Sequence, residues 1–162
     1  MPRNRMTSAL LVCLVLVGRP VAAGELVPFY GDWDGVTVSA SPTDDPTVVL
    51  VVSGGDGRAT QLGLFKMVSP HYTDLATFTV QGTQHFVAAN GDGLDATIEG
   101  QFVPQADGSL HAVLTGAFTG GSGRFAGASG TYEFHITSRP IGTGGFASTA
   151  RLIGTISTVG GH

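Results

Sequence analysis

The chain has 162 residues, a length typical of one domain, and a formal net charge of −4 at pH 7. It contains 25 glycines, whereas charged residues make up only 12% of it, about half of the usual share. No basic patch or stripe is visible, which argues against nucleic acid and anionic membranes as partners. Thr, Val, Phe and Gly outnumber the strong helix formers, so we expect an all-β protein.

The first 23 residues have the three parts of a secretory signal peptide. Arg3 and Arg5 make the start positive, residues 9–18 form an apolar run, and residues 21–23 (VAA) supply small side chains for cleavage. The apolar run is shorter than the roughly 20 residues of a membrane span, which makes a membrane anchor the weaker alternative. We predict a signal peptide over residues 1–23, a single domain over residues 24–162, and a secreted (extracellular or periplasmic) protein without stable membrane insertion after cleavage.

Removal of this segment would leave a cysteine-free and more acidic chain. Cys13, the only cysteine, lies inside the predicted signal peptide. The remaining part keeps five of the eight basic residues and all twelve acidic residues, which gives a net charge of −7. Because no disulfide could form within such a chain, its stability must come from a buried core.

The chain from residue 33 onward contains eight strand-like segments separated by turn signals. We predict turns at residues 53–57 (SGGDG), 69–74 (SPHYTD) and 90–93 (NGDG), among others. The short connections predict an antiparallel meander. The predicted strands cover residues 33–41, 47–52, 59–68, 76–89, 94–103, 110–119, 131–138 and 146–156.

Glycines inside the predicted strands favour a closed barrel. Gly63, Gly82, Gly100, Gly116 and Gly154 fall on the face that the alternation of apolar and polar residues predicts to be inner. A glycine there marks a bend or a close approach of two backbones, and closing a sheet requires such bends. The sequence therefore predicts an eight-stranded antiparallel meander β-barrel, with a β-sandwich as the alternative.

Residues 120–130 (GGSGRFAGASG) connect two predicted strands. They contain a loose G-x-G-x-x-A motif, but a strand follows it, whereas a dinucleotide-binding motif requires a helix. A Walker loop and a calcium-binding nonapeptide fit no better. Glycines would allow this loop to fold tightly over one end of a barrel. We expect Phe125 to plug that end, with Arg124 in solvent or paired with a carboxylate.

The same stretch resembles a segment of two known families. Residues 119–130 (TGGSGRFAGASG) resemble the Gly-Gly-Ser/Thr-Gly-x-Phe segment that joins two barrel strands in plant allene oxide cyclases and dirigent proteins. The wider chain is similar to small, secreted, largely uncharacterised bacterial proteins with the same glycine–Phe loop. The resemblance implies an apolar lumen open at one end. In the two named families this lumen steers a reactive small molecule to one stereochemical outcome, without metal or organic cofactor.

The inner-face residues define the candidate site. Few polar groups among apolar side chains are typical of a pocket for a small molecule, although an eight-stranded barrel can also be filled by its own side chains. We predict that the lumen binds a small apolar or aromatic molecule. The expected ligand-binding residues are Gln61, Phe65, Phe78, Gln84, Phe102, Phe118, Tyr132 and Phe134.

Other polar residues are expected outside the lumen. Glu99, His111, Glu133 and His135 fall on the outer face, so we interpret them as surface residues and predict no metal site. His71 is expected in a loop at the barrel mouth. No acidic residue can be aligned with those of the two families, so the catalytic residues, if there are any, are unknown.

Three functions remain open from the sequence. The first is a secreted binding protein for a small apolar or aromatic molecule. The second is a cofactor-free cyclase or isomerase, or a stereochemistry-directing protein, on the same barrel. The third is a non-catalytic structural protein of the envelope with a filled barrel. A continuous cavity would exclude the third, and an inward carboxylate or tyrosine beside that cavity would favour the second. Association into oligomers is compatible with the sequence but not implied by it.

Overall fold

The structure is a computed structural model that describes residues 24–142 and 144–157. The predicted signal peptide falls on residues 1–23, outside this range. The elements are β1 (Leu26–Pro42), β2 (Val48–Ala59), β3 (Gly63–Asp74), β4 (Thr79–Ala88), β5 (Gly93–Gln101), β6 (Val103–Pro104), β7 (Leu110–Gly121), the 3₁₀ turn η1 (Gly123–Phe125), β8 (Gly130–Pro140) and β9 (Phe146–Ser157). In the part of the chain so described, no helix is long and apolar enough to cross a membrane.

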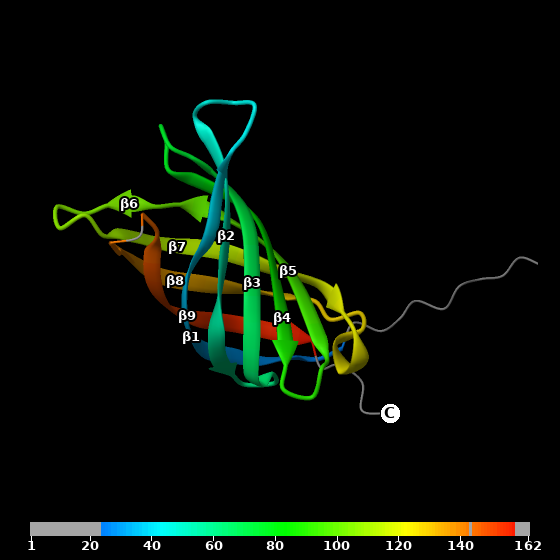
Figure 1. Ribbon diagram of the computed structural model, residues 1–162. Coiled ribbons are helices and arrows are strands. Elements are labelled where there is room, and N and C mark those ends of the chain that lie inside the picture. The colour runs from blue at the N-terminus through cyan, green and yellow to red at the C-terminus, as the bar shows by residue number, and fades with distance from the viewer. Residues whose placement is uncertain (1–23, 143, 158–162) are drawn as a thin grey trace, which may run out of the picture.

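Eight long antiparallel strands close into a barrel (Figure 1). Each strand pairs with its neighbours in the order β5-β4-β3-β2-β1-β9-β8-β7, and the pairing of β5 with β7 closes the ring. The two-residue strand β6 only extends the edge of β7 beyond the barrel. The predicted eight-stranded barrel is confirmed, and the sandwich alternative is wrong because a sandwich would leave strand edges unpaired.

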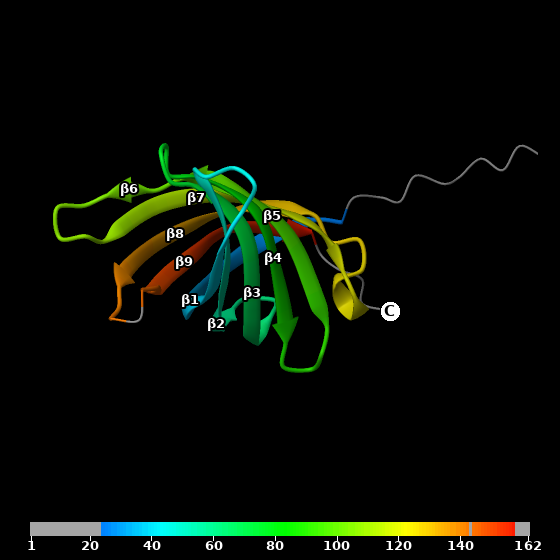
Figure 2. The same cartoon turned by 45° about the horizontal axis from the view of Figure 1, so that its top comes forward.

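The two ends of the barrel differ (Figure 2). The β2–β3 and β4–β5 turns and the loop that contains η1 lie at one end, together with the start of β1 and the end of β9. The β1–β2, β3–β4, β6–β7 and β8–β9 connections lie at the other end. We call the first the closed end, because buried side chains pack there, and the second the open end, because a cavity lies there.

Two predicted turns are wrong. Residues 53–57 and 69–74 lie inside β2 and β3, and the chain reverses instead at residues 60–62 and 75–78. Two of the three glycines in residues 53–57 lie where strands pack too closely for a side chain. A Cβ on Gly55 would collide with the Asp34 carbonyl, and one on Gly57 would collide with the ring of Phe65. Glycine-rich sequence therefore signals close contact here and not a turn.

The inner glycines of the remaining strands are confirmed, with one exception. A Cβ on Gly82, Gly100, Gly116 or Gly154 would overlap a side chain or the backbone of the neighbouring strand. Gly63 was predicted to belong with them, but it ends the β2–β3 turn with a φ of 71° and open space around it. Glycine is favoured at this position because it adopts the left-handed backbone conformation of the turn without a steric cost.

Substitution of Gly55 by alanine should destabilise the barrel. Because the added methyl group would force β1 and β2 apart, we expect a loss of about 1–3 kcal/mol in the free energy of unfolding, measured by urea denaturation. Gly142→Ala is the matched control, since nothing lies within 4 Å of its added Cβ. Equal midpoints for the two variants would contradict the close β1–β2 contact.

Candidate functional site

Aromatic rings fill the closed half of the lumen. Tyr132 is at the centre of this cluster, stacked on Phe118 with 4.8 Å between ring centroids and also in contact with Phe29 and Phe86. Phe29 meets Phe118 edge-on at 5.0 Å. Phe65 extends the cluster by an edge contact with Phe86 at 5.4 Å. All of these side chains are buried, and none of them lines the cavity of the open half.

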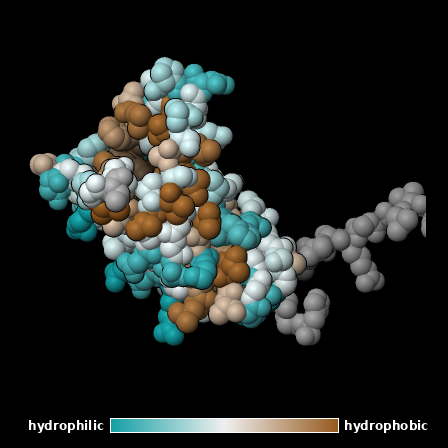
Figure 3. Space-filling model, in the orientation of Figure 1, coloured by the Kyte–Doolittle hydropathy of each residue, from teal (hydrophilic) through white to brown (hydrophobic). Residues whose placement is uncertain are grey.

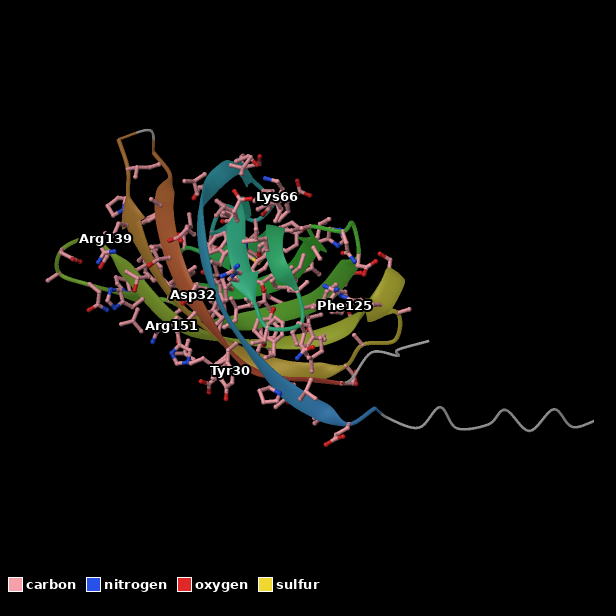
Figure 4. All side chains as sticks on the ribbon, turned by 90° about the horizontal axis from the view of Figure 1, so that it is seen from below. Tyr30, Asp32, Lys66, Phe125, Arg139 and Arg151 are labelled. Carbon is pink, nitrogen blue, oxygen red and sulfur yellow. The ribbon has the colours of Figure 1, made fainter. Side chains whose placement is uncertain are left out.

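The loop after β7 covers the closed end (Figure 4). Phe125 is completely buried and belongs to the hydrophobic core, which confirms the predicted plug. The Arg124 guanidinium lies 4.9 Å from the centroid of that ring. It donates a hydrogen bond to the Leu62 carbonyl at 3.2 Å, and its Nε is 3.6 Å from a carboxylate oxygen of Asp92. Arg124 thus ties the plug to the two adjacent turns, with the predicted carboxylate partner.

The open half of the lumen contains a cavity of about 350 Å³. In Figure 3 a hollow ringed by hydrophobic residues is visible at the open end. The residues that line the cavity are mostly apolar, and no Asp, Glu, Lys or Arg is among those the structure describes. They are Trp33, Thr37, Ala40, Val49, Val51, Ser53, Met67, Ser69, His71, Thr73, Leu75, Phe78, Val80, Gln84, Ile98, Phe102, Leu110, Leu114, Phe134, Ile136, Ser138, Gly144, Gly145, Phe146 and Ser148.

Trp33 and Phe134 bring aromatic surface into the cavity. Their ring centroids are 5.8 Å apart, and the indole lies over Gly35, where a Cβ would collide with it. Trp33 is only 2% exposed. Its Nε1 has no hydrogen-bond partner among residues 24–142 and 144–157. Trp33 is the only tryptophan of the chain, so its emission reports on this one place in the lumen.

A hydrogen bond separates the filled half from the cavity. The Tyr132 hydroxyl donates to Oε1 of Gln84, a cavity-lining side chain that is 2% exposed. Burial raises the pKa of Tyr132 far above its ordinary value, so the hydroxyl stays protonated and remains a donor. The Tyr132 hydroxyl takes one lone pair of Oε1, and the NH₂ group of Gln84 makes no hydrogen bond to the described residues, so it is available as a donor at the cavity.

Several serines add weak polarity to the cavity wall. The hydroxyls of Ser138 and Ser148 are hydrogen-bonded to each other at 2.8 Å across β8 and β9. The Ser69 hydroxyl donates to the Thr83 carbonyl at 3.1 Å. Because these hydroxyls already have hydrogen-bond partners within the wall, they do not need a further partner from a molecule in the cavity.

His71 is the one titratable side chain among the described residues that line the cavity. It lies on the inner face of β3 and not in the predicted loop, although its predicted place near the mouth is confirmed. Its Nδ1 is 3.0 Å from the Ser69 carbonyl. Burial lowers the pKa of His71 below its ordinary value, against a smaller opposing effect of this hydrogen bond.

The residues predicted to bind a ligand are divided by the structure. Phe78, Gln84, Phe102 and Phe134 line the cavity. Phe65, Phe118 and Tyr132 are in the filled half. Gln61 is a correction: it lies in the β2–β3 turn, exposed and with a φ of 67°, because the strand that was predicted to carry it begins two residues later.

The outer-face assignments agree with the structure. Glu133 and His135 form an exposed contact of 2.8 Å on β8, and Glu99 and His111 are exposed as well. Where the chain is described, no group of three or more His, Cys, Asp or Glu residues could hold a metal ion. The outer face around Tyr30 also carries the charged pair Asp32 and Arg151 (Figure 4), whose closest atoms are 3.6 Å apart.

The comparisons with known proteins yield a structural likeness. No protein-family model and no curated protein matches the sequence. Among solved structures, the chain is similar to the pterocarpan synthase dirigent protein GePTS1, over 86% of this chain and 89% of that protein, with 15% identity and a TM-score of 0.44. At this level the likeness carries no argument about ligand or activity.

Loss of the Tyr132 hydroxyl should weaken the fold. Tyr132→Phe leaves the buried Oε1 of Gln84 without its donor, and we expect about 1–3 kcal/mol of lost stability in thermal or urea unfolding. Tyr72→Phe is the control, because Tyr72 is 53% exposed on the outer face of β3. An equally small effect of both substitutions would show that the Tyr132–Gln84 hydrogen bond does not support the barrel.

Proposed function

We propose that the protein binds a small, uncharged, largely apolar or aromatic molecule in the open half of its lumen. The single observation that carries this proposal is the cavity of about 350 Å³, which opens at one end of an otherwise filled barrel. Its volume is within the roughly 300–1,000 Å³ that is typical of small-molecule sites. In this proposal Phe78, Gln84, Phe102 and Phe134 contact the ligand, together with Trp33 and His71.

The chemistry of the cavity wall supports an uncharged ligand. A carboxylate or ammonium group that enters an apolar cavity loses its hydration and requires an opposite charge there. The described wall supplies no charged side chain, and its histidine is held towards the neutral form. An apolar ring, in contrast, would gain contact with Trp33 and Phe134.

The two other functions are less well supported. A structural protein with a filled barrel is inconsistent with a cavity of this size. A cyclase or isomerase would need an acid or base at the ligand. Tyr132 is buried behind Gln84, and the described lining contains no carboxylate, so His71 is the one acid–base side chain that this lining offers, without a second group to work with it. Binding therefore accounts for more of the geometry than catalysis does. Export through the predicted signal peptide is part of the same proposal and would place the ligand outside the cytoplasm.

Blocking the lumen should abolish binding. Ser53 lines the cavity and makes no side-chain hydrogen bond to the described residues, so Ser53→Phe would place a ring inside the lumen. With the neutral fluorophore N-phenyl-1-naphthylamine as the probe, we expect a saturable increase in emission for the natural sequence. We expect at least about tenfold weaker binding for Ser53→Phe, equivalent to roughly 1.4 kcal/mol.

The matched control is Val52→Phe, on the same strand but absent from the cavity wall. It should bind the probe as the natural sequence does. If Ser53→Phe bound the probe with full affinity, the probe would have to bind on the outer wall of the barrel and not in the lumen. The absence of saturable binding across a panel of neutral aromatic probes would contradict the proposal itself.

A further inference from the structure

We propose that His71 selects the ligand, by accepting a hydrogen bond from a hydroxyl or N–H group on an otherwise apolar molecule. This inference rests on the proposed function and goes further, because it names the polar group that the ligand must carry. It assigns to His71 a role as a specificity-determining residue and requires no chemical step.

The hydrogen bond to Ser69 fixes which nitrogen of His71 carries the proton. A backbone carbonyl can only accept, so the contact of 3.0 Å requires a proton on Nδ1. In the neutral ring Nε2 then has a free lone pair. No hydrogen bond of Nε2 to residues 24–142 and 144–157 is present, and the ring borders the cavity. The fold thus presents an acceptor to whatever occupies the lumen.

The surroundings of His71 keep the ring neutral. On the inner faces of the neighbouring strands are Val49, Val51 and Ser53 of β2 and Val80, Gly82 and Gln84 of β4, none of which can carry a charge. Across the lumen, β8 contributes Phe134, Ile136 and Ser138 to the cavity.

The nearest acid along the strand offers no compensation either. Asp74 ends β3, where its carboxylate accepts hydrogen bonds from the backbone N–H groups of Ala76 and Thr77. Burial therefore acts on His71 without a compensating carboxylate, and its pKa is below the ordinary value of 6.5. At neutral pH the lone pair on Nε2 is available.

Gln84 complements His71. Gly82 pairs directly with His71, and Gln84 is the next inward residue of β4, so both side chains border the same part of the cavity. Gln84 offers the NH₂ group of its amide as a donor, since the Tyr132 hydroxyl binds its Oε1 and the NH₂ group has no hydrogen bond to the described residues. A hydroxyl group can donate to His71 and accept from Gln84 at once, which an ether oxygen cannot do.

The wall opposite His71 and Gln84 offers apolar surface to a ligand. β8 lies four strands away from β3 around the eight-stranded ring, directly across the lumen. Its Phe134, together with Trp33 of β1, offers ring faces to the apolar body of the ligand. A flat, neutral molecule with one hydroxyl or N–H at its edge would satisfy both sides.

A matched pair of probes isolates the hydroxyl donor. 2-Naphthol and 2-methoxynaphthalene have the same ring system and are both neutral at neutral pH, but only the first can donate a hydrogen bond. We expect calorimetric titration of the natural sequence to give about three- to tenfold tighter binding of 2-naphthol, the range of one net hydrogen bond. His71→Phe should remove this preference while both probes still bind. His71→Gln, which keeps an acceptor, should restore part of it.

A pH titration of the natural sequence tests the same point without a substitution. As the pH falls through the lowered pKa of His71, the lone pair is lost to a proton. The preference for 2-naphthol should therefore decline below pH 6.5 and be retained above it. The binding of 2-methoxynaphthalene provides the reference at each pH.

The possible failures are distinguishable. If both probes bind and both are lost in Ser53→Phe, but neither His71→Phe nor acid changes their ratio, the role of His71 is wrong and the lumen site stands. If neither probe binds, or if both still bind to Ser53→Phe, the proposed function fails and the role of His71 fails with it.

Discussion

Tyr132 packs against three phenylalanine rings in the closed half of the lumen, and its hydroxyl is the last group of that cluster before the cavity begins. These rings belong to the buried hydrophobic core and pack the closed half of the lumen, whereas the cavity lies in the other half. Glycines make this packing possible, since Gly116 leaves the space that the ring of Tyr132 occupies. Tyr132 thus lies at the boundary between the packed half of the barrel and the cavity.

The two halves of the lumen have different chemistry. In the closed half, Phe125 and Arg124 seal the end through contacts with two turns. In the open half, the polar groups of β3 and β4 face the apolar side chains of β8 across the cavity. If the cavity binds a ligand as proposed, this uneven distribution of polar groups would favour one orientation of the bound molecule. The described wall contains no charged side chain, which is the basis for proposing an uncharged ligand.

Sequence reasoning succeeded where the period of two was clear. From β5 to β9, large apolar residues alternate with polar ones, so the inner face, the outer position of Glu133 and His135, and the plug Phe125 could all be predicted. It failed in β2 and β3, because glycine and proline are signals of turns as well as of tightly packed strands. Gln61 was therefore placed inside, and His71 was assigned to a loop. The cavity itself could not be predicted, since it depends on how deeply side chains from several strands fill the lumen.

The central claim is that the lumen is filled at one end and open to a ligand at the other. The most direct measurement is the anomalous diffraction of a crystal soaked with 6-bromo-2-naphthol, which locates one bromine atom without any assumption about the natural ligand. The account predicts a bromine peak inside the barrel, among the side chains that line the open half, with the naphthol oxygen towards His71. A bromine peak on the outer wall, or a lumen closed by its own side chains, would contradict it.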